Sequence, residues 1–208
     1  TWLKEVLKDS HQQDASVLIN PVDTNLFHTM PRTAPMDTVR ILLLHHTYLW
    51  KGTAEGAALI EEMKERHPEI RFILFGVRSK DDISYAYDEY YYDLPQEELA
   101  SLYSNVDIYL CPSWEEGFGL PSVEAMHCGA TLVTYNNGGS RDYAIDGETA
   151  FVAPHRDKEA LAAKLETAIT NIALRKRIAE QGKNFVQNMP TWDKQTKKLE
   201  RILAGTIY

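Results

Sequence analysis

Two glutamates flank a glycine-rich turn near the middle of the chain. In the stretch EEGFGLPSVEAMHCGA, Glu116 and Glu124 stand eight positions apart. A glycine turn that runs into a helix presents backbone N–H groups at the positive end of the helix dipole, which suits a phosphate. An ionised carboxylate accepts hydrogen bonds from both hydroxyls of a ribose or sugar diol. We therefore expect the helix start to hold a diphosphate and the two carboxylates to hold the sugar rings on either side. The residues of the turn are Gly117, Phe118, Gly119, Leu120 and Pro121.

Further polar or glycine-rich loops follow other expected strands, and each has an ordinary structural interpretation beside the functional one. Lys51 lies between a strand and a helix and either faces the same crevice or is a solvated surface lysine. Gly138 and Gly139 either approach a ligand or only connect two elements. Glu124 either binds a diol or, as an acid expected in the first helical turn, complements the dipole. Loops at successive strand ends together favour the functional interpretation.

Composition limits the classes of protein that this chain can belong to. The 208 residues are 44% hydrophobic and 25% charged, which suits one domain with a sizeable core. A net charge of −8 argues against a nucleic-acid surface, and no apolar run reaches membrane length. We expect Cys111 and Cys128 to be buried reduced thiols in a cytoplasmic protein, and the cysteines and histidines show no metal-ligand spacing. Because the chain begins at Thr1, we expect a longer protein around it.

Short apolar runs alternate with helical patterns along the chain. This alternation predicts an α/β fold, a doubly wound parallel sheet of Rossmann-like type with helices on both faces, in which ligands bind beyond the carboxyl ends of the strands. The tyrosines between residues 85 and 92 are in part a strand, and they either pack in the structure or form a base-stacking platform. Expected strands are 16–20, 38–46, 70–75, 106–111, 130–135 and 150–152; expected helices are 54–66, 96–103, 122–128, 157–171, 173–187 and 192–204.

The segment 98–154 resembles the nucleotide-sugar-binding half of GT-B glycosyltransferases of family 4. Glu116 and Glu124 match the Glu-x7-Glu pair of that family, and NNGGSRDYAIDGETAFVAP is similar to its Gly-Gly loop and the turn that follows. Lys51-Gly52 after a core strand and INPVDTNLF at 19–27 extend the resemblance over roughly the whole chain. The resemblance implies the C-terminal, donor-binding half of a two-domain enzyme.

The resemblance also implies a division of the chain. Residues 1–28 would be a linker with a first short strand from the interdomain region, and residues 29–190 the nucleotide-sugar binding domain. Residues 191–208, with Trp192, would form a C-terminal helix that crosses back to an N-terminal acceptor domain preceding Thr1. That absent domain would be a partner of this one, and it would allow a location at the inner membrane surface.

The chemistry implied by the family is transfer of a hexose from a nucleotide diphosphate sugar to a glycan, lipid-linked or other acceptor, with retention at the anomeric carbon. No cofactor and no bound metal are expected, because basic side chains and helix N-termini neutralise the leaving diphosphate. Lys51 and Glu116 would be catalytic, and this half alone would be inactive. The residues implied in donor binding are His46, Lys51, Glu116, Gly117, Phe118, Gly119, Leu120, Glu124, Gly138 and Gly139.

Some positions depart from the family pattern. His46 stands where an arginine is usual, Asp142 replaces a glutamate, and the linker has Asn20-Pro21 in place of Asn-Gly. His46 either contacts the diphosphate or is a packed histidine that faces away. A nucleotide-sugar epimerase or hydrolase of the same fold, or a degenerate binding module, are the alternative functions.

Overall fold

In a computed structural model, which describes residues 2–205, six strands form one parallel sheet in the order β3-β2-β1-β4-β5-β6. The order reverses between β1 and β4, so the loops that leave these two strands diverge and open a crevice at their carboxyl ends. The predicted doubly wound fold is confirmed. The strands are β1 (Val39–Leu44), β2 (Ile70–Gly76), β3 (Glu89–Tyr92), β4 (Ile108–Cys111), β5 (Thr131–Tyr135) and β6 (Phe151–Ala153).

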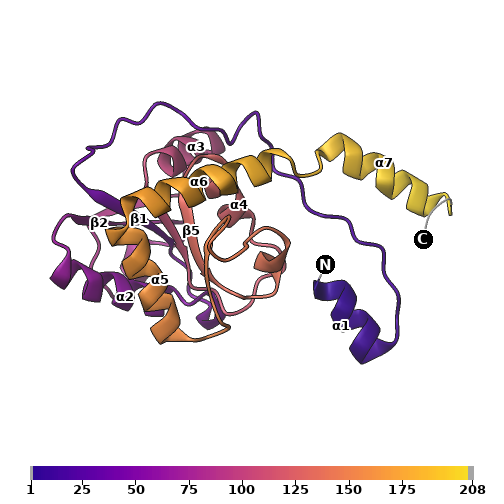
Figure 1. The fold of residues 1–208 in the computed structure, drawn as a ribbon, viewed down its shortest axis with the longest axis horizontal. Coiled ribbons are helices and arrows are strands. Elements are labelled where there is room, and N and C mark those ends of the chain that lie inside the picture. Colours follow the sequence, from indigo (N-terminus) through magenta and orange to yellow (C-terminus); the bar gives the residue numbers. More distant parts are fainter. Residues whose placement is uncertain (1, 206–208) are drawn as a thin grey trace.

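The helices cover both faces of the sheet because its central strands are apolar on both sides (Figure 1). Side chains of α2 and α5 form one buried cluster with the sheet, those of α3 and α4 form the other, and α6 contributes to both. Cys111 and Cys128 are buried and free, as predicted. The helices are α1 (Trp2–His11), α2 (Thr53–Arg66), α3 (Gln96–Ser104), α4 (Leu120–His127), α5 (Lys158–Thr170), α6 (Ile172–Gln187) and α7 (Trp192–Leu203).

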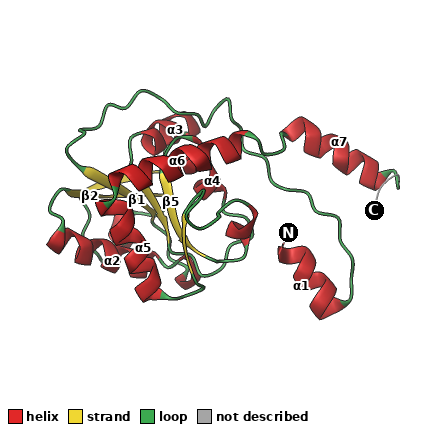
Figure 2. Ribbon diagram, viewed as in Figure 1, coloured by secondary structure: helices red, strands yellow, loops and turns green. Residues whose placement is uncertain are grey.

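The two terminal helices lie apart from the sheet (Figure 2), and neither contains a buried residue. The predicted strand at 16–20 is wrong, since this segment runs extended without a neighbouring strand. The ammonium of Lys198 on α7 donates a hydrogen bond to the carbonyl of Val17 in this segment at 2.7 Å. The helix α1 was not predicted. The expected strand 38–46 ends earlier, at Leu44, which leaves His46 in a loop.

Part of the tyrosine-rich segment forms the edge strand β3, as predicted, and several of its tyrosines contact other residues of the structure. Tyr90 donates its hydroxyl to the Arg78 carbonyl, and Tyr91 donates to the Glu89 carboxylate at 2.7 Å. Tyr87 and Tyr90 lie edge to face with their ring centroids 6.1 Å apart. These contacts favour packing over a base-stacking platform.

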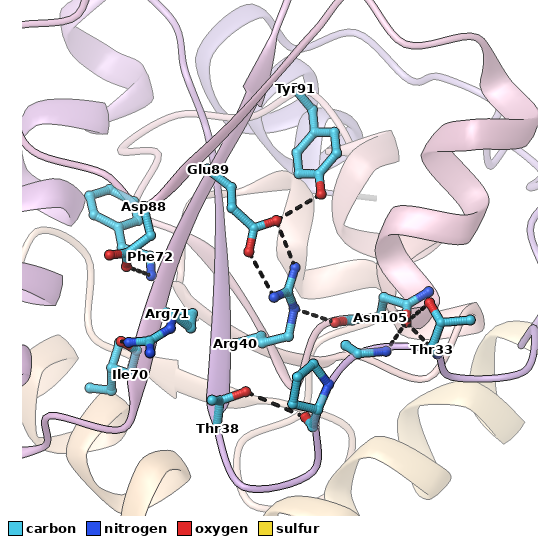
Figure 3. A network of polar contacts seen from close by, with 12 residues as sticks. Thr33, Thr38, Arg40, Ile70, Arg71, Phe72, Asp88, Glu89, Tyr91 and Asn105 are labelled. Carbon is cyan, nitrogen blue, oxygen red and sulfur yellow. Dashed lines mark hydrogen bonds and ion pairs between the residues drawn. The ribbon is translucent and has the colours of Figure 1, made fainter.

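A polar network fixes the amino ends of the strands, away from the crevice (Figure 3). The Arg40 guanidinium donates to both oxygens of Glu89 at 2.8 and 3.0 Å and to the Asn105 carbonyl at 2.8 Å. The Asn105 side-chain oxygen accepts from the amides of Thr33 and Ala34 at 2.8 and 2.9 Å. These bonds hold the segment before β1 to the sheet and fix the amino ends of β1 and β3, opposite the crevice.

Candidate active site

The loops that follow β4 and β5 are joined to one another at the carboxyl edge of the sheet. The Glu116 amide donates to the Asn137 carbonyl at 3.0 Å, and the Gly139 amide donates back to the Glu116 carbonyl at 3.0 Å. A Cβ on Gly139 would stand 2.7 Å from the Phe118 backbone, so only glycine allows this approach. The two glycine-rich motifs therefore form one double loop, with residues 116–119 against residues 137–139.

The start of α4 leaves a run of backbone donors without partners. Gly119 takes a positive φ of 90° and turns the chain into the helix, and Pro121 has no N–H to satisfy. Within residues 2–205, no hydrogen bond is donated by the amides of Gly117, Phe118, Gly119 or Leu120. Unpaired N–H groups at a helix N-terminus attract anions. The turn thus has the free N–H groups that an anion site requires, and the anion site itself stays a prediction.

Lys51 and Glu116 meet beside this turn. Lys51 ends a short 3-10 turn, Leu49–Lys51, that follows β1, and its ammonium donates to Glu116 Oε1 at 2.7 Å. The side chains are only 22% and 12% exposed, so the ion pair is partly withdrawn from water. The structure therefore brings the two predicted catalytic residues together, from strands whose loops lie on opposite sides of the switch point.

Glu124 lies deeper than the sequence predicted. The helix begins at Leu120, before the expected Ser122, so Glu124 falls in the second helical turn and the prediction of a first-turn acid is wrong. Burial raises the pKa of its carboxyl to about 7, against which the Tyr103 hydroxyl, donating at 3.4 Å, acts in the opposite direction. A carboxyl this hard to ionise is poorly suited to complementing the helix dipole, and it has capacity for more hydrogen bonds.

His46 stands at the same edge as an uncharged ring. Its Nδ1 accepts the Tyr48 amide at 3.1 Å, so this nitrogen carries no proton. The ring lies 4.4 Å from that of Tyr48, which stacks in turn on Trp50 at 4.5 Å. Burial lowers the pKa of His46, and the neighbouring charges of Lys51 and Arg78 lower it further. The arginine of the family pattern is therefore replaced here by a neutral aromatic side chain.

A small apolar hollow next to His46 was missed in the sequence. Its volume is about 130 Å³. His45 also borders the hollow, but its ring packs against Tyr85 and Tyr90, and its Nδ1 lies 2.6 Å from the Tyr85 hydroxyl. The sequence signal for the hollow is Gly76 at the end of β2, which has no side chain to fill the space, together with the apolar residues Val77, Leu94 and Leu99 in the following segments. Its walls include Leu44, Phe75, Val77, Leu94 and Leu99.

The remaining glycine of the motif faces the N-terminal helix. Gly138 has a positive φ of 86°, and a Cβ there would meet the Trp2 ring at 2.8 Å. Its positive φ favours glycine irrespective of any ligand. The Gly-Gly pair thus has structural reasons at both positions, and its part in donor binding stays a prediction.

The sequence profile of the family described as "Glycosyl transferases group 1" matches residues 32–185, well over half of the chain. The chain belongs to the group 1 glycosyl transferases. As a member of this family, it resembles the gpi3 subunit of phosphatidylinositol N-acetylglucosaminyltransferase from Schizosaccharomyces pombe, with 28% identity over 97% of this chain and 45% of that protein. The capsular polysaccharide biosynthesis glycosyltransferase CapM of Staphylococcus aureus is 35% identical over 42% of this chain and 23% of its own length.

Solved structures of the same fold agree with this assignment. Sucrose-phosphate synthase from Thermosynechococcus elongatus superposes with a TM-score of 0.85, at 20% identity, over 98% of this chain and 56% of that one. Anabaena Alr3699/HepE, solved in complex with UDP-glucose, gives a TM-score of 0.73 at 20% identity, over 91% of this chain and 57% of that one. The relatives that match nearly the whole of this glycosyltransferase chain are longer, and the chain spans about half of their length.

The part of the chain that the structure describes, residues 2–205, contains no membrane-spanning helix and no metal-binding cluster. None of their helices combines the length and the apolar character that crossing a bilayer requires. No cluster of three or more histidine, cysteine, aspartate or glutamate side chains in this part of the chain is arranged to hold a metal ion.

Proposed function

We propose that this chain is the donor-binding half of a retaining hexosyltransferase that uses a nucleotide diphosphate sugar without a bound metal. One observation carries the proposal: Gly119, whose amide has no partner within residues 2–205, lines the same small cavity as Lys51 and Glu116 at the carboxyl edge of the sheet. A diphosphate accepts hydrogen bonds from amides and is attracted by an ammonium, and both can act on it here together.

The other groups of the site match the remaining parts of such a donor. The Glu124 carboxyl has one long hydrogen bond and would accept from the ribose diol. The hollow beside His46 is lined mainly by apolar side chains, with Tyr91 and Asp93 as polar groups, which suits a nucleobase. Glu116 and the backbone of Gly117 and Phe118 would then face the sugar.

The same groups would stabilise the transition state of transfer. The bond between the anomeric carbon and the diphosphate oxygen breaks, and its electron pair stays on that oxygen, where negative charge grows. The acceptor hydroxyl oxygen bonds to the carbon, and its proton passes to the leaving diphosphate. Fixed N–H donors and Lys51 act where this charge develops, and they need no reorganisation during the reaction. The hexose, the retention of configuration and the glycan, lipid-linked or other acceptor follow from the family resemblance, and HepE with UDP-glucose supports a nucleotide-sugar donor.

Calorimetric titration with UDP, GDP, ADP and TDP, with and without EDTA, tests the proposal. We expect at least one diphosphate to bind, with unchanged affinity in the chelator. Lys51→Gln should weaken that binding about tenfold or more, because a hydrogen bond to a charged group is lost. Lys64→Gln is the matched control, since Lys64 pairs with Asp88 at the amino end of the sheet.

Three results would contradict the proposal: no diphosphate bound, binding abolished by EDTA, or equal losses in the two lysine variants. In the full-length enzyme, sugar transfer to an added acceptor separates a transferase from an epimerase, which changes the donor alone, and from a hydrolase, which passes the sugar to water.

A further inference from the structure

The hydroxyl of Tyr143 lies directly beneath the glycine turn. It donates to the Phe118 carbonyl at 2.8 Å, with the Gly119 carbonyl further away at 3.5 Å. Tyr143 is 1% exposed, so no water competes for this bond. The contact crosses from the loop after β5 to the loop after β4, and it is the side-chain counterpart of the backbone bonds between Glu116 and Gly139.

This hydrogen bond fixes the direction of a neighbouring donor. The Phe118 carbonyl and the Gly119 N–H belong to one peptide plane, in which the two groups point in opposite directions because the bond is trans. A hydroxyl that holds the carbonyl on the buried side therefore turns the Gly119 N–H away from Tyr143. That N–H is one of the unpartnered amides at the start of α4.

Without the hydroxyl, this peptide plane would be free to rotate. Gly119 has a φ of 90°, and glycine adopts either sign of φ with little cost, so its own conformation does not oppose a flip. A Cβ at position 119 would stand 2.6 Å from the Tyr143 hydroxyl, so that oxygen fills the space beside the glycine. A flipped plane would present a carbonyl oxygen, in place of an N–H, to the anion.

Tyr143 is itself fixed in place by contacts that do not involve its hydroxyl. Its amide donates to the Ser140 carbonyl at 3.1 Å, and its own carbonyl accepts from the Thr149 hydroxyl at 2.7 Å. Its ring meets that of Phe118 edge to face at 5.4 Å. Removing the hydroxyl alone would leave these three contacts in place.

We propose that Tyr143 is a positioning residue that locks the Phe118–Gly119 peptide so that the Gly119 N–H points at the distal phosphate of the donor. The inference rests on the proposed function and deepens it, because it assigns the phosphate selectivity of the site to a residue that does not touch the ligand. Tyr143 affects only the distal phosphate, because the nucleobase and the ribose have other partners in the proposed site.

The test compares the affinities of the chain for a nucleoside diphosphate and for the monophosphate of the same base. In Tyr143→Phe we expect the diphosphate to bind about tenfold more weakly, the usual effect of losing one hydrogen bond to a charged group. The monophosphate should keep its wild-type affinity, so the ratio of the two dissociation constants falls. Free pyrophosphate, as a competitor, should weaken in step with the diphosphate.

Tyr135→Phe is the matched control, because it also removes a buried hydroxyl, one that donates to Glu55 on α2 at 2.5 Å. Both variants should unfold at lower temperature, but only Tyr143→Phe should change the ratio. An unchanged ratio in Tyr143→Phe, or an equal change in both variants, would overturn the inference while leaving the proposed function intact. Failure of the wild-type chain to bind any diphosphate would instead overturn the proposed function.

Discussion

At the scale of single residues, the site contains a carboxyl whose pKa is raised by folding into the neutral range. Burial raises the pKa of Glu124 to about 7, above the ordinary value of 4.5. Between these two values the folded chain binds more protons than the unfolded chain, so the free energy of unfolding falls as pH rises through this window. Glu124 is therefore a destabilising residue at pH 8, which indicates selection for something other than stability.

Glu124→Gln should raise the free energy of unfolding at pH 8 by about 3 kcal/mol, since one pKa unit corresponds to about 1.4 kcal/mol and the pKa rises from 4.5 to about 7. At pH 4.5 wild type and variant should be nearly equally stable. Urea unfolding at the two pH values measures both. If a ribose diol bonds to the ionised carboxyl, donor affinity in wild type should rise with pH up to about 7, and the variant should lose this rise. Equal stability of the two proteins at pH 8 would contradict a raised pKa.

His46 should act on donor affinity with the opposite sign if it touches the diphosphate. Its pKa is lowered in the free chain, chiefly by burial, and a bound anion would raise it. The complex would then hold more protons, so affinity would fall as pH rises between the free and the bound pKa values. His46→Arg should remove this fall and strengthen binding at pH 8. An intact nucleotide sugar titrated from about pH 5.5 to 8.5 measures it; parallel curves would show a histidine that only packs on Tyr48.

The sequence predicted which residue types the site contains, because lysine, glutamate and glycine at strand ends have recognisable chemistry. It could not predict the ion pair of Lys51 with Glu116, which depends on side-chain directions across the sheet. Tyr143 was invisible for a similar reason: its hydroxyl acts on Phe118, 25 residues earlier, and nothing local marks it. The expected start of the helix at Ser122 is two residues late, because Pro121 is tolerated within the first turn and does not mark the helix boundary.

At the scale of elements, the double loop depends on the absence of a side chain at one position. A Cβ at Gly139 would stand 2.7 Å from both the Cα and the nitrogen of Phe118, which are backbone atoms that cannot step aside. Gly139→Ala should lower the free energy of unfolding by about 1–3 kcal/mol, the usual cost of overpacking. It should also weaken diphosphate binding, because separating the loops displaces the turn.

Gly117→Ala is the control for that prediction, because a Cβ at Gly117 meets nothing within 4 Å. Its stability should stay within about 0.5 kcal/mol of wild type in urea unfolding. Equal destabilisation of the two variants would show that the close approach of the loops is not what requires glycine at position 139.

Strand–helix alternation was sufficient to predict the sheet, since apolar runs such as residues 39–44 can be buried on both faces only in such a fold. The segment 16–20 shows the limit of that reasoning. Its apolar pattern suits a strand, but a strand needs a neighbour with free backbone groups, and whether a sheet edge lies within reach is a tertiary property. The helix α1 was missed although its apolar residues Trp2, Leu3, Val6 and Leu7 recur at a helical spacing.

At the scale of the whole molecule, the terminal helices α1 and α7 are not packed into the core that the sheet organises. Neither α1 nor α7 contains a buried residue. Large apolar side chains of α7 are instead exposed, Trp192 at 60% and Leu203 at 79%. The predicted division of the chain at residues 28 and 190 stays a prediction, as does the acceptor domain. The observation agrees with a chain that spans about half the length of the relatives that match along it.

The ion pair between Lys51 and Glu116 has a consequence for how fast a donor arrives. Glu116 cancels the charge of Lys51 while the site is empty, and the chain carries a net charge of −8, so a distant anion meets repulsion and no attraction. Salt screens such repulsion, and the association rate constant should therefore increase from about 10 to about 150 mM ionic strength, whereas electrostatic steering would make it fall. Stopped-flow tryptophan fluorescence measures this rate. Glu116→Gln removes the charge that neutralises Lys51 and should therefore raise the association rate constant at low salt. A wild-type rate constant that falls with salt would contradict this, because it would mean that the ion pair opens before the donor comes near.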